Sequence, residues 1–208
     1  MRPPGFRGAA FGSSGDGDGG SDPKSRRRIS DELGVPAAWA VIRQVHGADV
    51  IEADGPGRVG AADGVFTRVP DLPLAVTTAD CVPVVLEGPS GVGVAHAGWQ
   101  GAAAGVVAAA REAMEVAGAT PVRAAIGPGI GPCCFEVGPE VSNVFPANRT
   151  RTRWGTASVD LWGSVASELD GLEVWRADTC THCGKGYFSY RRDRTGHRQV
   201  AVGWLPRG

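Results

Sequence analysis

The stretch LAVTTADCVPVVLEGPSGVGVAHAGWQG, residues 74–101, carries the clearest strand pattern of this chain. Residues 74–78, 82–86 and 91–96 are three short apolar runs rich in β-branched side chains, and Gly, Pro or Asp stand between them. Runs of this length and composition, bounded by turn residues, are typical of buried strands. The stretch therefore predicts three strands that follow one another closely.

Gly98-Trp99-Gln100-Gly101 ends the stretch and leads into an Ala-rich segment that reaches about Val116. Alanine is the best helix former, so this segment predicts a helix directly after the third strand. The other elements that we predict are a helix at 26–33, strands at 38–45, 123–126 and 199–205, and helices at 139–144 and 159–169. Together they predict an α/β (α+β) fold with one mixed β-sheet core flanked by helices.

Composition limits the size of the fold and the kind of ligand. A chain of 208 residues suits one domain with a substantial core. With 21 basic and 22 acidic residues it has no overall field to attract nucleic acid or a membrane surface, so we expect a small-molecule ligand. No targeting segment or membrane span is visible, and we expect a cytoplasmic protein. The sequence leaves the oligomeric state open and is compatible with a monomer.

Residues 12–25, GSSGDGDGGSDPKS, are nearly devoid of apolar side chains. Such a segment buries too little to offset the entropy of ordering. We therefore predict a mobile N-terminal segment at 1–25 and a catalytic domain at 26–208.

The chain's few histidines and cysteines fall at the ends of predicted strands. The chain has only four histidines, and two of them, His46 and His96, lie where a predicted strand meets a Gly-containing turn. Cys81 lies just beyond the strand at 74–78. Two imidazoles and a thiolate form an incomplete zinc shell whose open position suits catalysis. We predict a zinc site here, with copper as an alternative. The rival interpretation is a nucleophilic pair in which Cys81 acts with one of the histidines as base.

The other four cysteines give a weaker signal. Five cysteines in a chain of this size argue for reduced thiols rather than a disulfide framework. Cys180-Thr-His-Cys183 has CxxC spacing but supplies half a structural metal site, and the adjacent Cys133 and Cys134 are poor candidates for the other half. We therefore expect no second metal, and a Cys180→Ser/Cys183→Ser variant that keeps the wild-type metal content.

Six ordered motifs resemble the laccase-domain family, whose members were named multicopper polyphenol oxidases and later purine nucleoside phosphorylases. They are QVHG (44–47), ADGVFT (62–67), TADCVP (78–83), HAGW (96–99), IGPGIGPCCFEV (126–137) and FSYRR (188–192). The resemblance covers residues 38–205 and implies that His46, Cys81 and His96 hold the metal. It also implies a mixed sheet flanked by helices, similar to the fold of certain cysteine hydrolases, and no metal on the adjacent cysteines.

The activity implied by the resemblance is phosphorolysis of adenosine, inosine and methylthioadenosine, with adenosine deamination as a side activity. A Cys-His amide hydrolase that edits peptidoglycan precursors and a weakly active metal-binding relative are the alternatives. A true multicopper laccase needs about ten histidines, far more than the four present, and that interpretation is rejected. The substrates would be a purine nucleoside and phosphate.

Further site residues follow from the same motifs. We predict Asp80, beside Cys81, as an acid-base or supporting group, although an Asp at a turn is more often a backbone cap. Gln44 and Gln100 are predicted to contact substrate. Arg191 is a candidate anion seat, although a solvated surface arginine is an equal alternative. Backbone amides of the loop 127–131 are a further candidate for binding an anion.

Two departures from the family pattern affect the substrate. The family has arginine where this chain has Gln100, so we expect weaker phosphorolysis that Gln100→Arg improves. The family also has a longer strand-bearing segment before residue 38, and we expect one wall of the pocket to be altered.

Overall fold

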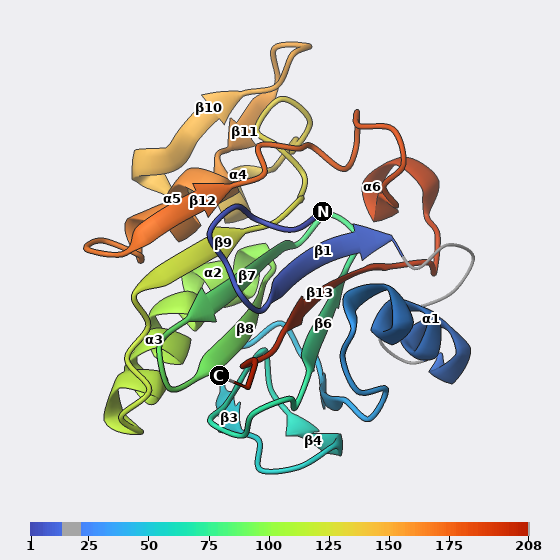
Figure 1. Ribbon diagram of the computed structural model, residues 1–208. Coiled ribbons are helices and arrows are strands. Elements are labelled where there is room, and N and C mark those ends of the chain that lie inside the picture. Colours follow the sequence, from blue (N-terminus) through green and yellow to red (C-terminus); the bar gives the residue numbers. More distant parts are fainter. Residues whose placement is uncertain (14–21, 208) are drawn as a thin grey trace.

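Two mixed β-sheets pack face to face at the centre of the molecule (Figure 1). The computed structural model describes residues 1–13 and 22–207. The five-stranded sheet has the order β1 (Ala9–Ser13), β13 (Gln199–Gly203), β6 (Leu74–Thr78), β2 (Ala40–Arg43) and β4 (Gly57–Ala61). The six-stranded sheet has the order β12 (Glu173–Arg176), β9 (Arg123–Ile126), β7 (Val82–Glu87), β8 (Val92–Ala97), β5 (Gly64–Thr67) and β3 (Val50–Glu52). A separate hairpin pairs β10 (Arg149–Arg151) with β11 (Ala157–Val159).

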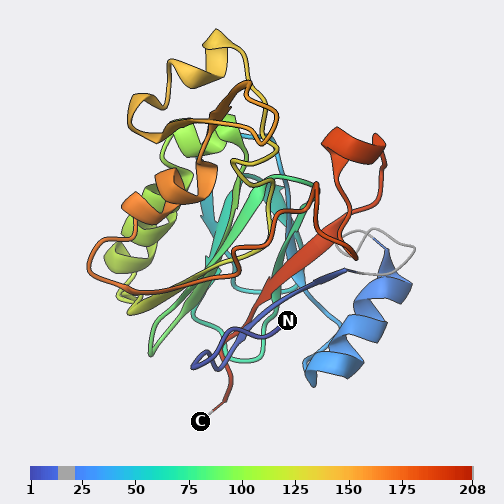
Figure 2. The same ribbon diagram turned by 90° about the horizontal axis from the view of Figure 1, so that it is seen from above.

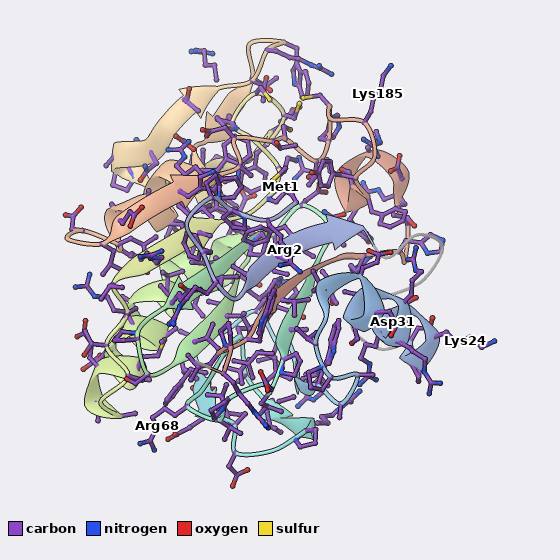
Figure 3. All side chains as sticks on the ribbon, viewed as in Figure 1. Met1, Arg2, Lys24, Asp31, Arg68 and Lys185 are labelled. Atoms are coloured by element: carbon purple, nitrogen blue, oxygen red, sulfur yellow. The ribbon has the colours of Figure 1, made fainter. Side chains whose placement is uncertain are left out.

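Helices cover the outer faces of both sheets, which gives four layers (Figure 2). On one side lie α2 (Trp99–Ala103), α3 (Val106–Val116) and α5 (Leu161–Ser167), and on the other lies α1 (Pro23–Leu33). Three short helices, α4 (Pro139–Ser142), the 3-10 helix η1 (Pro146–Asn148) and α6 (Tyr190–Asp193), lie in the connections. In Figure 3, Lys24 and Asp31 point away from the sheets on the outer face of α1.

The side-chain alternation of the strands explains the layers. Within β7, Val84 and Leu86 join the cluster under α2, α3 and α5, while Val85 points to the other side and joins the cluster between the two sheets. Within β6, Val76 joins the inter-sheet cluster and Ala75 joins the cluster under α1. Because successive side chains of a strand point to opposite faces, a strand covered on both faces must be apolar throughout. This is why the predicted runs at 74–78 and 82–86 lack polar alternation.

Between β2 and β7 the chain passes from the five-stranded sheet to the six-stranded sheet three times. The connections from β2 to β3, from β4 to β5 and from β6 to β7 each leave the five-stranded sheet and enter the six-stranded one. His46 lies in the first of these connections, Asp63 in the second and Cys81 in the third. The fold therefore brings these three side chains together although they are far apart in the sequence.

The predicted class of fold is confirmed, with two sheets in place of one. Strand β9 lies at the predicted residues 123–126, whereas the predicted single helix after Gly98 is divided into α2 and α3 at Gly105, which has a left-handed backbone with φ +76°. Short strands β3, β4, β5, β10, β11 and β12 were not predicted.

The prediction that the fold begins only after residue 25 is wrong for the N-terminal residues. Strand β1 pairs antiparallel with β13 from the other end of the chain, and the Phe11 side chain is 3% exposed in the inter-sheet core. Asp22 caps α1, accepting hydrogen bonds from the Lys24 and Ser25 amides. The part of the predicted mobile segment at 14–21 lies outside the described residues. Among the residues that the structure describes, no helix is long and apolar enough to cross a membrane.

Candidate metal centre

The structure brings together the three predicted metal ligands His46, Cys81 and His96. One ligand atom from each lies within 4.8 Å of the others, and His46 Nε2 is 4.0 Å from Cys81 Sγ. The two imidazole rings meet edge to face, with centroids 4.8 Å apart and an interplanar angle of 80°. His96 pairs with Pro83 across the β7–β8 ladder, which places it beside the start of β7, where Cys81 lies.

The backbone around the ligands adopts conformations that non-glycine residues rarely take. His46 has φ +62° and Asp80, just before Cys81, has φ +92°; strained φ values of this kind collect at functional sites. Gly98 is required for a different reason, since a Cβ there would lie 2.9 Å from His46 Cδ2 and 3.2 Å from Cys81 Sγ. The glycine of the HAGW motif therefore allows the backbone to approach two ligands closely.

Asp63 holds two of the three ligands in place through hydrogen bonds. Its side chain is fully buried, and Oδ1 lies 2.8 Å from His96 Nδ1. Its Oδ2 accepts hydrogen bonds from the amides of Val45 and Gly47, at 3.1 and 2.7 Å. One carboxylate thus orients the ring of His96, leaving Nε2 for a ligand, and holds the loop that carries His46.

The thiol of Cys81 and the ring of His96 shift each other's protonation. Burial acts to raise the pKa of Cys81, but hydrogen bonds with His46 and His96 outweigh it and lower this pKa to about 6. Burial acts to lower the pKa of His96, but its bonds with Asp63 and Cys81 raise this pKa to about 9. Burial likewise opposes the change at Asp63, whose pKa is lowered by the bonds from His96, Gly47 and Val45. At neutral pH Cys81 is therefore a thiolate, the form that binds metal.

The donor set fits a zinc ion. Two imidazoles and one thiolate are common zinc ligands, and three protein ligands leave a fourth position open, as in catalytic zinc sites. His96 is 2% exposed whereas His46 is exposed, so the open side of the site faces outward. Copper is compatible with the same donors.

A pocket of about 760 Å³ opens above the three ligands and includes all of them in its lining. Arginines from three separate segments, Arg26 on α1, Arg58 on β4 and Arg198 beside β13, also line it. The hydroxyl of Thr78 lies in the same lining, is buried and has no hydrogen-bond partner among the described residues. The pocket thus combines a metal site, cationic side chains and a free hydroxyl.

The structure gives the other predicted site residues different positions. Gln44 lines the pocket, but its side-chain amide bonds both backbone groups of Thr77, at 2.8 and 2.9 Å, and so links the segment after β2 to the end of β6. Gln100 lies on the exposed face of α2 and is not among the residues that line the pocket.

Asp80 and Arg191 interact with each other rather than with the pocket. Asp80 is 9% exposed, and its carboxylate accepts hydrogen bonds from the Thr181 hydroxyl and the Arg191 amide, each at 2.7 Å. The Arg191 guanidinium donates to the Glu136 carbonyl and lies over the Phe135 ring. Neither residue lines the pocket. We therefore regard both as groups that fix the loops around Cys81.

Sequence reasoning missed Asp63 and the arginines of the pocket. Asp63 lies in the motif ADGVFT, and a carboxylate that bonds the second ring nitrogen of a ligand histidine is a common arrangement. The motif could therefore have indicated Asp63 as the partner of His46 or His96. The arginines come from residues 26, 58 and 198, and nothing in the sequence indicates that they converge.

The prediction that Cys180 and Cys183 have no further ligands nearby is wrong. The structure places the sulfurs of these two residues and of Cys133 and Cys134 within 4.8 Å of one another. All five cysteines of the chain are free thiols.

Comparison with known proteins gives the family. Residues 12–206 match the family described as multi-copper polyphenol oxidoreductase laccase, and the chain belongs to this family. A Streptomyces griseus protein named purine nucleoside phosphorylase is 42% identical over 206 residues, which cover 89% of this chain and 84% of that protein. A protein of the same name from Escherichia coli is 32% identical, over 88% of this chain and 80% of that protein.

Solved structures agree with this assignment. The crystal structure of the Bacillus licheniformis hypothetical protein YfiH superimposes with a TM-score of 0.85 at 27% identity, covering 95% of this chain and 92% of that one. YlmD from Geobacillus stearothermophilus gives a TM-score of 0.84 at 28% identity, over 97% and 94% of the two chains. The mixed α/β fold of this family is thus the fold of the chain.

Proposed function

We propose that the chain is a metal-dependent purine nucleoside phosphorylase whose site is formed by His46, Cys81 and His96. The observation that carries the proposal is that one pocket holds both this three-donor site and three arginines. The relatives named purine nucleoside phosphorylase support the same class of substrate. We place the enzyme in a reducing compartment such as the cytoplasm, where five free thiols persist.

The arginines provide the seat for phosphate. A guanidinium presents its donors in a planar fork that matches phosphate oxygens, and each charge-assisted bond contributes about 1.5 to 3 kcal/mol. Arg58 lies on β4 next to β2, on the same wall as Gln44, while Arg26 and Arg198 approach from other elements. The pocket therefore has its own positive charge, although position 100, where the family pattern has arginine, is Gln and lies outside the lining.

The reaction breaks the bond between C1′ and the purine and forms a bond between C1′ and a phosphate oxygen. The electron pair of the broken bond leaves with the purine, which takes up the proton that hydrogen phosphate gives up as its oxygen bonds C1′, so the products are the base and ribose 1-phosphate. The pocket residues hold the two reactants close together and in line, which alone removes much of the barrier. The buried hydroxyl of Thr78 is the group that we assign to hydrogen bonding with the nucleoside.

A bound zinc ion would supply Lewis-acid polarisation and a lowered pKa for water in the same pocket. The contribution of the chain is to fix the donor atoms, and Asp63 does so for His96 directly and for His46 through the loop. We include adenosine deamination as a side activity, and adenosine, inosine and methylthioadenosine as substrates. We do not propose multicopper oxidase chemistry, because a chain with four histidines lacks the ligands for it.

A cysteine amide hydrolase is the second candidate, and one observation favours it. His96 lies between Cys81 on one side and the buried Asp63, which it bonds, on the other. This is the arrangement of a nucleophile, its base and the carboxylate that orients the base. In this alternative the thiolate attacks a carbonyl and no metal is needed.

Product analysis separates the two candidates. Zinc-loaded protein is incubated with adenosine, inosine or methylthioadenosine, with and without phosphate, and in parallel with muramyl peptides. We expect free base and ribose phosphate in equal amounts, only with phosphate, and loss of this activity after chelation. Amide cleavage by the metal-free protein, blocked by iodoacetamide, with no base release under any condition would replace the proposal by the hydrolase.

A further inference from the structure

Four cysteines from two distant loops meet on the side of the molecule that carries the β10–β11 hairpin. Cys133 and Cys134 follow β9, and Cys180 and Cys183 follow β12. All four Sγ atoms lie within 4.8 Å of one another. The Sγ of Cys133 is 3.5 Å from that of Cys134 and 3.8 Å from that of Cys183. The four sulfurs therefore form a compact group and not two separate pairs.

These separations agree with four ligands of one tetrahedral ion. A Zn–S bond of about 2.3 Å separates neighbouring sulfurs by roughly 3.8 Å in a tetrahedron. The two shortest contacts equal this value or lie just below it, and because all the sulfurs lie within 4.8 Å of one another, the other pairs need a contraction of at most roughly 1 Å. Cys134 and Cys180 are buried while Cys183 is exposed, so an ion can reach the group from solvent and then be enclosed on one side.

The backbone of the CxxC turn holds its shape without any bond between sulfurs. The Gly184 amide donates to the Cys180 carbonyl at 2.7 Å, and a Cβ at Gly184 would lie only 2.5 Å from that oxygen. The Gly131 amide, from the loop that carries Cys133 and Cys134, donates to Cys180 Sγ at 3.2 Å. Amide donors to a sulfur stabilise the thiolate form, so this contact prepares Cys180 as a ligand.

Positive charge lies close to the group. The Arg192 guanidinium donates to the carbonyls of Thr181 and His182, within the CxxC turn, at 3.0 and 2.7 Å. The Arg153 amide donates to the Cys133 carbonyl. Four thiolates around a divalent ion carry a net charge of minus two, and the Arg192 guanidinium, which also pairs with Asp193, lies close enough to offset part of it.

From this geometry we propose that Cys133, Cys134, Cys180 and Cys183 bind a structural zinc ion, separate from the centre formed by His46, Cys81 and His96. All four ligand positions of the ion are filled by protein, which is the arrangement of structural and not of catalytic zinc. The inference does not depend on the proposed function.

The zinc would fasten two loops that both hold the segment before Cys81. The Thr181 hydroxyl donates to the Asp80 carboxylate, and the Ile130 amide donates to the Asp80 carbonyl, each at 2.7 Å. Thr181 lies between the two cysteines of the CxxC turn, and Ile130 lies in the loop of Cys133. The ion therefore stabilises the left-handed backbone of Asp80 from a distance.

The test measures zinc in a His46→Ala/His96→Ala variant, in which the first centre is disabled. Elemental analysis after growth with zinc should give about two zinc ions per wild-type chain and one in this variant. Adding Cys183→Ser should lower the affinity for the remaining zinc ion at least about tenfold. Loss of a residue that only supports a ligand already costs about 10-fold or more, and loss of a ligand itself should cost at least as much. Lys185→Ala is the matched control, since this side chain projects into solvent just beyond the turn (Figure 3), and it should keep the wild-type content.

A measurement without mutation guards against a variant that does not fold. Titration of wild-type protein with a mercurial should release a second zinc ion as the four cluster thiols react, and cobalt substitution should give the intense absorption of tetrahedral thiolate ligation. Release of no more than one zinc ion, or a zinc-free double variant with native far-UV dichroism, would overturn the proposal. A Cys133–Cys183 disulfide in protein purified under nitrogen would overturn it as well.

Discussion

The buried carboxylate of Asp63 bonds His96 Nδ1 at 2.8 Å through one oxygen and the amides of Val45 and Gly47 through the other. Two of the three metal ligands therefore depend on one side chain that binds no metal itself. Three chain passages between the sheets bring this group together, and the carboxylate fixes the passage of His46 against the strand of His96.

Asp63→Asn should lower zinc affinity at the first centre by about 10- to 100-fold, because an amide cannot accept from His96 and from both loop amides in the same way. Competition with a chromophoric chelator measures the affinity. Asp49→Asn is the control, since Asp49 is exposed and contacts Asp63 only through its backbone. Equal affinities in the two variants would contradict the role of Asp63.

Metal-free protein should react with iodoacetamide at Cys81 with a midpoint near pH 6, because hydrogen bonds with His46 and His96 lower its pKa to about 6 against burial. Burial raises the pKa of Cys133 to about 11, so this thiol should stay unreactive at pH 7. Peptide mapping of the alkylated chain at successive pH values distinguishes the two sites. A Cys81 midpoint near 9 would show that the thiolate is not stabilised.

The stability of metal-free protein should depend little on pH between about 6.5 and 9. The raised pKa of His96 contributes stability that is present below 6.5 and lost as pH rises through about 9. The lowered pKa of Cys81 contributes stability that is present above 9 and lost as pH falls through about 6. The two slopes oppose each other over this window.

Removing the thiol should expose the slope of the histidine. In Cys81→Ser the remaining bond of His96 to Asp63 still raises the histidine pKa, so the free energy of unfolding should fall as pH rises, by up to roughly 1.4 kcal/mol per pH unit. Urea unfolding of both proteins at pH 6.5, 7.5 and 8.5, with chelator present, checks this. Parallel pH profiles would contradict the coupling of Cys81 and His96.

Arg58→Gln should raise the KM for phosphate about tenfold or more, because a charge-assisted bond is lost. Deamination, which uses no phosphate, should change less. Gln100→Arg should have little effect, since Gln100 lies outside the pocket lining, and this revises the expectation from the motif alone. Steady-state kinetics with varied phosphate measure all three proteins. A large gain in Gln100→Arg with no loss in Arg58→Gln would return the phosphate seat to position 100.

The sequence predicted those parts of the molecule that have a local signal. Strands β6, β7 and β8 are apolar along most of their length because both faces are covered, and His46, Cys81 and His96 stand at or near strand ends in recognisable motifs. Strand β1 was missed because it adjoins a Gly, Ser and Asp run and is stabilised by β13 from the other end of the chain.

The missed parts of the sites depend on tertiary contacts. Asp63 acquires its role only when the β4–β5 connection meets β8, and Arg26, Arg58 and Arg198 share a pocket only after folding. The two cysteine pairs lie far apart in the sequence: Cys133 and Cys183, whose sulfurs are in contact, are separated by 50 residues. No spacing rule for a single segment identifies a site of that kind.

Metal-dependent phosphorolysis at His46, Cys81 and His96 is best tested by the phosphate dependence of adenine release from adenosine, measured by chromatography for zinc-loaded wild type and for Cys81→Ala. We expect adenine and ribose 1-phosphate in equal amounts, a rate that saturates with phosphate, and loss of this rate in Cys81→Ala. Absence of adenine release by the zinc-loaded wild type, or release that is independent of both phosphate and Cys81, would contradict the proposed phosphorolysis.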